Sequence, residues 1–395
     1  MKKIILFWAI FLTFSQINLK TLALEELEDV GIAKYAVLET TVANIPLREK
    51  DNENSKRISH LFERTVLFAV KQNKHYYKVE LNENNFAWIN KNNVEVQAVI
   101  PEKRFDDIVQ IKNKTKKEKH ILEIKTESKS PFRFIENGSN LSFVMYDVHF
   151  DPLNIKNSDK INHFIFSDKI ENELKIDYLS NRPLFGYELN KNEDGYLLVV
   201  KKAPKVDSKK PLKDIVITLD AGHGGCECGV CAHNLKEKDV NLQITKKLKK
   251  ELQKKGAKVY LTRKRDKKVA LYERCDFARE KNSDILLSIH QNSLPNPKNV
   301  DKKHGVGTYY YHNQSKPLAQ SILDNLVENT NFRNDGVNFA SFALTRPTSQ
   351  ISVLVECGYL IKEDEALKLK DKKFQKIIAK SITKGCEEYL KNSFN

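Results

Sequence analysis

The segment "DIVITLDAGHGGCECGVC", residues 214–231, decides how the C-terminal half of the chain folds. Its first seven residues are mostly apolar and predict a buried strand. Glycines then flank one histidine, His223, and three cysteines follow before residue 232. In α/β proteins, functional side chains come from the loops that follow strands. The segment is therefore compatible with three kinds of metal site: one that uses His223, one that uses the cysteines, and one that uses both.

Beyond this segment, strand patterns alternate with helical patterns to the end of the chain. In residues 237–256, apolar residues recur every fourth position from Val240 to Leu252, and Gly256 is the expected C-cap. Further strands are expected at 257–262, 284–290, 305–311 and 351–357, and further helices at 269–281, 318–329 and 373–389. The alternation predicts an α/β domain over residues 214–392, with a mixed sheet and helices on both faces.

The first half of the chain is expected to form two small all-β domains. All six cysteines lie beyond residue 225, so the two halves differ in composition. Short alternating segments rich in β-branched and aromatic residues predict strands in residues 33–95 and again in residues 105–202. Two prolines and six lysines between Lys201 and Asp214 indicate an exposed linker, which we place at residues 203–213.

Residues 1–23 have the pattern of a secretory signal peptide. Lys2 and Lys3 precede the apolar run "IILFWAIFLTF", and small residues, Thr21 and Ala23, occupy the positions that a signal peptidase reads. The apolar run is too short to span a bilayer. We therefore expect an exported protein of the periplasm or cell envelope, with no membrane span in the mature chain.

The mature chain is expected to be basic. Removing the signal peptide takes away three lysines and no acidic residue, so the formal charge falls from +15 to +12. Outside the cytoplasm, a basic protein meets anionic envelope polymers and lipid headgroups, and nucleic acid is not an expected partner. Because the lysines are scattered along the sequence, they fit a solvated surface better than a dedicated binding patch.

Three predicted strands lead into a residue that can bind a metal or carry a proton, namely His223, His290 and Glu356, and Glu237 begins the first predicted helix. Like ends of neighbouring strands converge, so these four side chains are expected to meet. A catalytic zinc takes three protein ligands, often two histidines and a carboxylate, and keeps a fourth position for water. A second carboxylate can take and return the proton of that water.

Seven segments between residues 215 and 389 resemble, in order, one enzyme family. They are "LDAGHGG", "EKDVNL", "LTRKRD", "LYERCDFAREKNSDILLSIHQN", "GVGTYYY", "ISVLVECGYL" and "FQKIIAKSITKGCEEY". The family is the zinc-dependent N-acetylmuramoyl-L-alanine amidases of the type that includes the catalytic domains of cell-division amidases. The resemblance implies that His223, Glu237 and His290 hold one zinc ion per chain and that Glu356 is the catalytic acid and base. It also implies hydrolysis of the peptidoglycan amide that joins N-acetylmuramic acid to L-alanine.

The two predicted β domains also resemble known modules. "ANIPLRE", "YYKVEL" and "AWI" are similar to a bacterial SH3-like domain over residues 33–95, although Ala87 stands where that family usually has glycine. Residues 105–202 are similar in arrangement and place to the envelope-targeting AMIN domain, with a plain β-sandwich spacer as the alternative. These resemblances imply binding to the cell wall and contacts with envelope or division-site proteins.

Other polar residues lie near the motifs. Asn292 either touches substrate or caps the loop that follows His290. Arg263 and Arg274 match positions of the family and are expected to form structural ion pairs. Three further histidines have no converging partner and are expected at the surface: His233, His304 and His312.

The cysteines beside His223 leave two interpretations open. Cys226, Cys228 and Cys231 can form a disulfide or remain free thiols, which we favour because the chain offers no clear fourth ligand nearby. The alternative is a second, thiolate-rich metal site that includes His233. Cys357 is expected to be a buried thiol on the face of its strand opposite Glu356.

Two other functions and one mode of regulation follow from the same sequence. A non-catalytic cell-wall-binding protein is disfavoured by the intact four-residue set, and a zinc peptidase acting within the stem peptide would use the same chemistry. Some members of the family carry a helix that plugs the site, but "GVGTYYYHNQSKPLAQ" passes from strand to helix without room for one. We therefore expect the N-terminal β domains to control activity through localisation.

Overall fold

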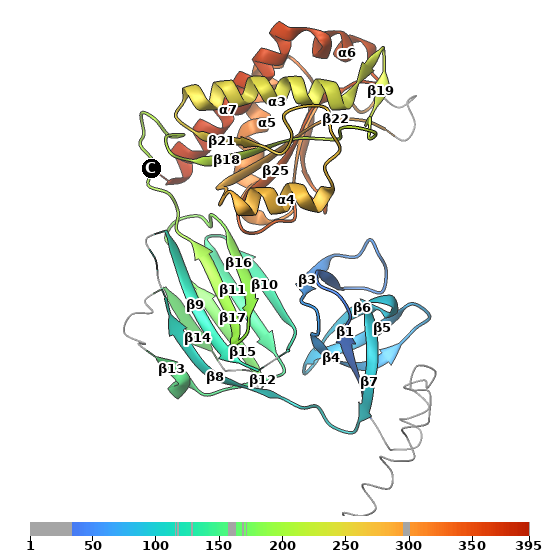
Figure 1. Ribbon diagram of the computed structural model, residues 1–395, viewed down its shortest axis with the longest axis vertical. Helices are drawn as coiled ribbons and strands as arrows, with labels where there is room; N and C mark the ends of the chain where they lie inside the picture. The colour runs from blue at the N-terminus through green and yellow to red at the C-terminus, as the bar shows by residue number, and fades with distance from the viewer. Residues whose placement is uncertain are drawn as a thin grey trace, which may run out of the picture.

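The computed structural model describes residues 34–114, 116, 118–127, 129–156, 163–167, 170, 172–294 and 301–394. Two β units and one α/β unit follow one another along the chain (Figure 1). The expected signal peptide, residues 1–23, lies outside the described residues. In the described part, no helix combines the length and the apolar character that crossing a bilayer requires.

The first unit is a seven-stranded antiparallel sheet in the order β3-β2-β6-β5-β4-β1-β7. Alternate residues of its strands are buried, as Tyr77, Val79 and Leu81 of β5 illustrate. The strands are β1 (Tyr35–Thr40), β2 (Ile45–Arg48), β3 (Arg57–Leu61), β4 (Val66–Gln72), β5 (Tyr76–Asn82), β6 (Asn85–Asn90) and β7 (Val94–Ile100). Strand β7 therefore continues beyond residue 95, where the sequence placed the end of this domain.

The second unit consists of two sheets, in the orders β10-β11-β15-β14 and β12-β8-β9-β17-β16, with β13 paired to β8. One core contains side chains of both sheets, such as Phe143 and Ile176 from the first and Leu122 and Leu198 from the second. The strands are β8 (Asp106–Asn113), β9 (Lys119–Thr126), β10 (Phe132–Asn137), β11 (Asn140–Tyr146), β12 (Val148–Phe150), β13 (Ile155–Lys156), β14 (Phe164–Ser167), β15 (Glu173–Tyr178), β16 (Tyr187–Asn192) and β17 (Gly195–Lys201). The unit is a β-sandwich.

Buried side chains cross between the units. Val144 and Tyr146 of β11 belong to the core of the first unit. Phe185, which precedes β16, is 2% exposed and belongs to the core of the α/β unit, where its ring centroid lies 5.1 Å from that of Phe394. The backbone amide of Tyr187 also donates to the carbonyl of Thr348 at 2.8 Å. The β-sandwich is therefore packed against both of its neighbours.

The α/β unit is built on a six-stranded sheet in the order β21-β18-β22-β25-β23-β24. The first four strands in this order pair in parallel, and β23 pairs antiparallel with β25, so the predicted mixed sheet is confirmed. The strands are β18 (Val216–Ala221), β21 (Lys258–Leu261), β22 (Ile285–Asn292), β23 (Val306–Tyr310), β24 (Asn334–Phe339) and β25 (Ile351–Tyr359). A short hairpin of β19 (Cys231–Ala232) and β20 (Leu235–Lys236) precedes the first helix.

Helices cover both faces of this sheet, as predicted (Figure 1). Leu287 of β22 packs in the main core with α3 (Glu237–Lys254), α5 (Lys316–Thr330) and α7 (Lys372–Phe394). Its neighbour Leu286 points to the other face and packs against Ala278 of α4 (Leu271–Glu280). Helix α3 ends at Lys254, with Lys255 as its C-cap, so the C-cap predicted at Gly256 was one residue late. Gly256 follows with a φ of +92°.

Three features of the α/β unit differ from expectation or were not predicted. Strand β24 and helix α6 (Glu363–Lys370) were missed, because "NDGVNF" lacks apolar alternation and α6 is only eight residues long. The predicted linker 203–213 is not exposed throughout, since Leu212 is fully buried in the core of the α/β unit. Between β23 and α5 the chain forms only the single 3-10 turn Asn313–Ser315, and no plugging helix occurs there.

Candidate metal centre

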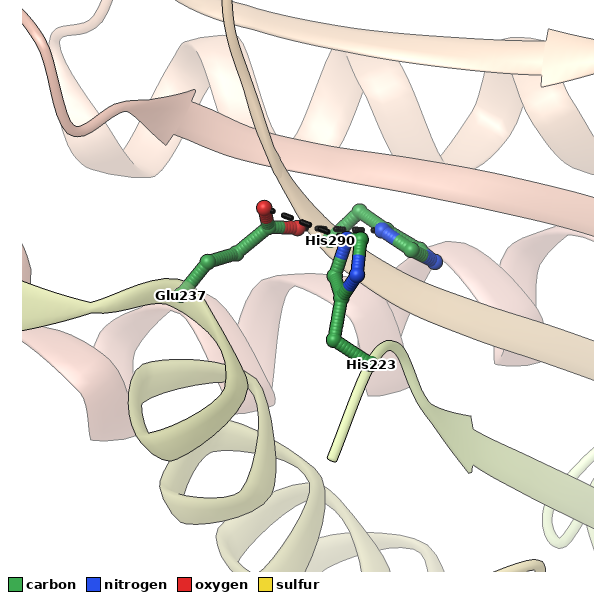
Figure 2. A group of neighbouring side chains, drawn as sticks. All are labelled: His223, Glu237 and His290. Carbon is green, nitrogen blue, oxygen red and sulfur yellow. Dashed lines mark hydrogen bonds and ion pairs between the residues drawn. The ribbon is translucent and has the colours of Figure 1, made fainter. Parts of the chain in front are cut away.

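Three side chains from three elements meet at the carboxyl ends of β18 and β22 (Figure 2). His223 lies in the loop after β18, Glu237 is the first residue of α3, and His290 lies near the end of β22. One donor atom from each lies within 4.8 Å of the other two. Glu237 Oε2 is 3.2 Å from His223 Nε2, and Glu237 Oε1 is 3.0 Å from His290 Nδ1. The structure thus brings together the three predicted ligands, and their metal-binding role stays a prediction.

The carboxylate of Glu237 is buried and held in place from several sides. Its Oε1 accepts hydrogen bonds from the backbone amide of Gln291 at 3.1 Å and from Asn241 Nδ2 at 3.2 Å. Its Oε2 accepts one from the backbone amide of Val230 at 2.9 Å. Burial raises the pKa of this carboxyl, but hydrogen bonds and charges from the two histidines outweigh burial and hold the pKa below its ordinary value. The group is an oriented anion, which suits it to bind a cation.

Two glycines leave the space that these side chains occupy. A Cβ atom at Gly222 would lie 2.2 Å from Cε1 of the His290 ring. A Cβ atom at Gly229, where φ is +70°, would lie 2.4 Å from Glu237 Oε2 and 2.7 Å from His223 Cδ2. Any larger residue at either position would displace a candidate ligand, so both glycines are required by close approach.

His223 adopts a left-handed backbone conformation with φ of +60°, which is unfavourable for a residue other than glycine. Arg274 of α4 supports this conformation, because its Nη2 donates to the carbonyl of His223 at 3.0 Å. The same guanidinium pairs through Nη1 with Asp220 Oδ1 at 2.7 Å, and both side chains are almost fully buried. The expected structural ion pair of Arg274 is therefore confirmed.

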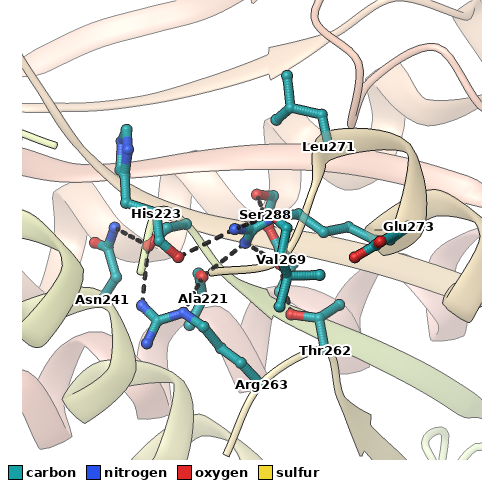
Figure 3. Close-up of polar contacts among 12 residues, drawn as sticks. Ala221, His223, Asn241, Thr262, Arg263, Val269, Leu271, Glu273 and Ser288 are labelled. Atoms are coloured by element: carbon teal, nitrogen blue, oxygen red, sulfur yellow. Dashed lines mark hydrogen bonds and ion pairs between the residues drawn. The ribbon is translucent and has the colours of Figure 1, made fainter. Parts of the chain in front are cut away.

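Arg263 fixes the same loop without an ion pair. Its guanidinium donates to the carbonyls of Ala221 at 2.7 Å, Gly222 at 3.0 Å and Lys238 at 2.7 Å (Figure 3). No carboxylate of the described residues lies within ion-pairing distance of it, so the expected ion pair of Arg263 was wrong. The side chain instead ties the His223 loop to the start of α3 through backbone carbonyls.

Glu356 lies on β25 directly beside His290 of β22 in the parallel register. Its side chain is buried, and its Oε2 has no hydrogen-bond partner among the described residues. Burial raises the pKa of this carboxyl well above its ordinary value, and the negative charges of Glu237 and Asp335 raise it further. A carboxyl group that holds a proton this strongly beside a candidate metal centre is suited to proton transfer.

A second polar cluster adjoins Glu356. Asn292 Nδ2 lies 3.4 Å from Tyr309 Oη and 3.4 Å from Asp335 Oδ2, and Tyr359 Oη donates to the same Asp335 oxygen at 2.7 Å. Asn292 Oδ1 also accepts from the backbone amide of Ser293 at 2.8 Å. The loop-capping alternative for Asn292 is therefore present in the structure, and its contact with substrate stays a prediction.

A disulfide joins Cys228 to Cys231 in the loop that follows His223. Cys226 is left as an exposed thiol, so a second metal site built from all three thiolates would have lost two of its ligands. The favoured interpretation, a disulfide with a free thiol, agrees with this arrangement. Cys357 is fully buried, as expected.

The three additional histidines have different environments. His233 is exposed, in agreement with the prediction. His304 and His312 were wrongly placed at the surface, because their side chains are only 21% exposed and each meets a buried glutamate. Nδ1 of His304 lies 2.8 Å from Glu365 Oε1, and Nδ1 of His312 lies 3.5 Å from Glu136 Oε1. These partners are distant in sequence, so no local pattern could identify them.

Several residues that support the site were missed from the sequence. Asp220 binds Thr262 Oγ1 at 2.6 Å and Ser288 Oγ at 2.7 Å as well as Arg274, and so joins three neighbouring strand ends. Its position in "LDAGHGG", at the end of a strand, was the available signal. Asp335 had no such signal, because it lies in the strand that was not predicted.

Comparisons with known proteins cover mainly the α/β unit. The family model described as N-acetylmuramoyl-L-alanine amidase matches residues 217–388. "Uncharacterized protein YqiI" of Bacillus subtilis (strain 168) is 31% identical over 196 residues, which cover 49% of this chain and 93% of that one. N-acetylmuramoyl-L-alanine amidase LytC of the same organism is 30% identical over 208 residues, which cover 51% of this chain and 42% of its own length.

One solved structure is also similar to this chain over less than half of its length. N-acetylmuramoyl-L-alanine amidase AmiC2 of Nostoc punctiforme is 32% identical, covers 45% of this chain and 97% of that one, and aligns with a TM-score of 0.42. The chain thus spans nearly all of YqiI and AmiC2 but less than half of LytC. The two N-terminal β units lie outside residues 217–388, the part that the family model matches.

Proposed function

The chain belongs to the N-acetylmuramoyl-L-alanine amidase family through its α/β unit, and on this premise we propose a zinc-dependent mechanism for that unit. The reaction of the family is hydrolysis of the peptidoglycan amide between N-acetylmuramic acid and L-alanine. We assign His223, Glu237 and His290 to the metal and Glu356 to proton transfer. The convergence of His223, Glu237 and His290 beside the buried Glu356, whose Oε2 has no hydrogen-bond partner in the described part of the chain, is the observation that carries this assignment.

The residues present fit zinc. Two imidazoles and one carboxylate are the ligand set of many catalytic zinc sites, which leave a fourth position open. The side chains of His223 and His290 remain 31% and 18% exposed, so substrate can approach them. The buried, ionised Glu237 supplies the negative charge, and its further hydrogen bonds from Asn241 and two backbone amides orient it. When bound, zinc supplies a Lewis acid and lowers the pKa of water.

Glu356 is proposed to move the proton. In its ionised form, Glu356 accepts a proton from the attacking water through Oε2, which has no hydrogen-bond partner among the described residues, and later donates that proton to the nitrogen of the departing L-alanine. The amine is a poor leaving group without that proton, and burial of Glu356 favours its protonated form. Asn292, which lies beside Tyr309 and Asp335, is proposed to contact the substrate.

The place of action is also a proposal. A relationship to amidases of the cell wall supports an exported protein of the cell envelope, and the Cys228–Cys231 disulfide fits an oxidising compartment. We further propose that the two β units, which resemble SH3-like and AMIN domains, direct the enzyme to its polymer and control activity through localisation.

A substitution of one ligand tests the proposal. We expect His223→Asn to abolish hydrolysis of a muramoyl tripeptide and to weaken zinc binding. Loss of a residue that only hydrogen-bonds to a zinc ligand weakens zinc binding by roughly 10- to 100-fold, and loss of the ligand itself should weaken it by more. His233→Asn is the matched control, because His233 is exposed and lies in the same loop region. Chelation should remove the activity of the unsubstituted chain, and zinc should restore it. Full activity after verified metal removal would refute the mechanism.

The alternative of a peptidase acting within the stem peptide uses the same residues. It differs only in which amide is cut, so the products of the same assay distinguish it. A binding protein without activity would show neither cleavage nor a dependence on Glu356.

A further inference from the structure

A cleft with a volume of about 990 Å³ lies where the three units meet. The first unit contributes β3 and its neighbours, the β-sandwich contributes β10 and β16, and the α/β unit contributes α4 and the segment after β24. Figure 1 labels β3, β10, β16 and α4, which belong to the three units that line the cleft. A cavity of this size is in the range of sites that bind small molecules or short polymer segments.

The catalytic residues do not line this cleft. Helix α4 separates the two sites, because Tyr272, Asp276 and Arg279 lie on its face toward the cleft. Arg274, on the opposite face, donates to the carbonyl of His223. A ligand in the cleft would therefore lie next to the catalytic centre without occupying it.

One corner of the cleft is lined by Arg57 and Arg346, and the buried Arg48 lies close enough to Arg57 to lower its pKa; we call these three residues the arginine corner. Their guanidinium groups contact the carbonyl of Ser55, the ring of His60 and the carbonyl of Ser341, respectively. No carboxylate of the described residues forms an ion pair with any of them. Burial lowers the pKa of Arg57, and the neighbouring charges of Arg346 and Arg48 lower it further, so the three cations are close enough to repel.

The electrostatics of a nearby histidine support this description. Burial and the charges of Arg57 and Arg346 lower the pKa of His60 to about 3. His60 is therefore neutral at physiological pH and does not offset or add to the charge. A half-buried set of like charges is costly to assemble unless an anion completes it.

The acidic residues that line the cleft do not neutralise this corner. Asp276 pairs with Arg279 at 2.6 Å, and Glu49 lies 4.0 Å from Lys56. Glu136 accepts hydrogen bonds from Tyr187 at 2.8 Å and from the backbone amide of Gln314 at 3.1 Å. Glu188 also lines the cleft, on the β-sandwich side.

Aromatic rings lie beside the arginine corner. Tyr311 and Phe339 stack with ring centroids 5.1 Å apart, and the hydroxyl of Tyr311 lies 3.4 Å from the carbonyl oxygen of Arg57. Tyr272 and Phe339 line the cleft and are 63% and 57% exposed, respectively, so a ligand in the cleft can reach both rings. Flat aromatic faces next to fork-shaped cations suit a ligand that has both ring surfaces and carboxylates.

We propose that the cleft is a second peptidoglycan-binding site, in which the arginine corner holds a stem-peptide carboxylate and the exposed rings pack against sugar faces. The inference rests on the proposed function for the identity of the polymer. A glycan strand carries several stem peptides, so one can occupy the cleft while another is presented to the catalytic centre. Binding at two points increases the time that the enzyme spends on one strand.

The test measures binding of the full chain to insoluble peptidoglycan from which phosphate polymers have been removed. Every protein carries Glu356→Gln, which keeps the polymer intact. We expect Arg57→Gln with Arg346→Gln to raise the half-saturation concentration about tenfold or more, because charge-assisted bonds are lost. The matched control is Arg64→Gln with Arg182→Gln, two exposed arginines outside the cleft, and it should bind like its parent.

A chemical change in the polymer tests the same idea without changing the corner. The corner variant is the protein with Arg57→Gln and Arg346→Gln. The parent should bind peptidoglycan with amidated carboxylates as weakly as this variant binds native peptidoglycan. This comparison remains decisive if the corner variant does not fold. Equal binding of native and amidated polymer would overturn the inference, as would a folded corner variant that binds like its parent. Stronger competition by polyglycerol phosphate than by soluble stem peptides would also overturn it, because phosphate would then be the ligand.

The outcome is separable from that of the proposed function. Hydrolysis of a muramoyl tripeptide by the unsubstituted chain tests the catalytic proposal by itself. Corner-dependent binding without hydrolysis would refute the catalytic proposal and leave the second site standing. Hydrolysis together with binding that depends neither on the arginine corner nor on the carboxylates of the polymer would support the catalytic proposal and refute the second site.

Discussion

Glu356 is buried, and its Oε2 has no hydrogen-bond partner among the residues that the structure describes, which is an unfavourable combination for a carboxyl group. The buried Glu365, by contrast, accepts from the Tyr359 amide at 2.7 Å and contacts His304. The contrast supports a functional role for Glu356. Active sites commonly retain such costs because the group is needed for chemistry.

We expect Glu356→Gln to reduce turnover by at least about a hundredfold, since general acid–base catalysis contributes about that much or more. Zinc content should not change, because the substitution preserves size and does not alter the three proposed ligands. Glu280→Gln, an exposed glutamate on α4, is the control and should keep full activity. Turnover by the Glu356 variant close to that of the control would remove Glu356 from the mechanism.

The same substitution should stabilise the metal-free protein in a pH-dependent way. The raised pKa of Glu356 means that the folded state holds this proton more tightly than the unfolded state does. Ionisation therefore reduces wild-type stability as pH rises above the unfolded value of about 4.3, whereas glutamine cannot ionise. We expect the stability advantage of Glu356→Gln to be absent near that pH and to reach about 1–3 kcal/mol above the folded pKa.

Urea unfolding of metal-free wild type and variant between pH 4.5 and pH 8 measures this difference. Comparing the two proteins at each pH cancels the titration of all other groups. An advantage that stays constant or shrinks as pH rises would contradict the raised pKa.

At the level of single residues, sequence patterns identified the candidate centre and the structural role of Arg274, but not the other residues that support the centre. His223, Glu237 and His290 follow or precede regular elements, and parallel pairing of β18 and β22 brings their ends together. Asp335 approaches Glu356 through a strand whose sequence has no apolar alternation. The glutamate partners of His304 and His312 depend on tertiary packing, so no spacing rule applied to them.

Helix α4 supports the conformation of the His223 loop through Arg274. Arg274 connects it to Asp220, to the carbonyl of Ala221 at 2.9 Å and to the carbonyl of His223. The helix has few apolar contacts of its own, since Ala278 and Arg274 are its buried residues. Its attachment therefore depends on this buried polar network more than on apolar packing.

We expect Arg274→Ala to destabilise the α/β unit by about 3–5 kcal/mol, because it leaves the buried Asp220 carboxylate without its cation. Zinc affinity should fall as well, since the His223 carbonyl loses its donor. Arg279→Ala is a matched control on the same helix, and its exposed pair with Asp276 should contribute about 0–1 kcal/mol. Urea unfolding and zinc titration check both variants, and equal stability for the two would show that the network is not structural.

At the level of elements, the sequence predicted most of the α/β unit because apolar periodicity is strong there. The buried β25 and the amphipathic α3 are examples, and their boundaries differ from expectation by only a few residues. Strand β24 and helix α6 were missed because they are short and polar, and only their tertiary contacts hold them in place. The fold class was predictable, whereas these edge elements were not.

On the scale of the whole molecule, the three units share buried residues. Phe185 lies in the β-sandwich part of the sequence but packs in the core of the α/β unit against Phe394. Lys201 Nζ also donates to the carbonyl of Ser283 at 2.6 Å. The exposed linker predicted at residues 203–213 suggested that the domains on its two sides are independent. The contacts between them were not predicted, because they join residues that lie outside the linker.

We expect Phe185→Ala to destabilise the α/β unit by about 3–5 kcal/mol, the usual cost of removing a buried phenylalanine. The effect would be unexpected if the units were independent, because Phe185 precedes the predicted linker. Leu179→Ala serves as control, since Leu179 is 41% exposed and should change stability little. Loss of zinc-dependent activity during urea titration reports on the α/β unit, and an unshifted midpoint for Phe185→Ala would exclude the coupling.

We propose that this chain cuts one particular amide of peptidoglycan with the residues gathered around His223. The most direct test of this proposal is digestion of purified peptidoglycan by the full chain, followed by identification of the new ends by mass spectrometry. We predict free amino termini on L-alanine, intact glycan strands and no such products with Glu356→Gln. New ends within the stem peptide, or no new ends from a zinc-loaded and folded protein, would contradict the account.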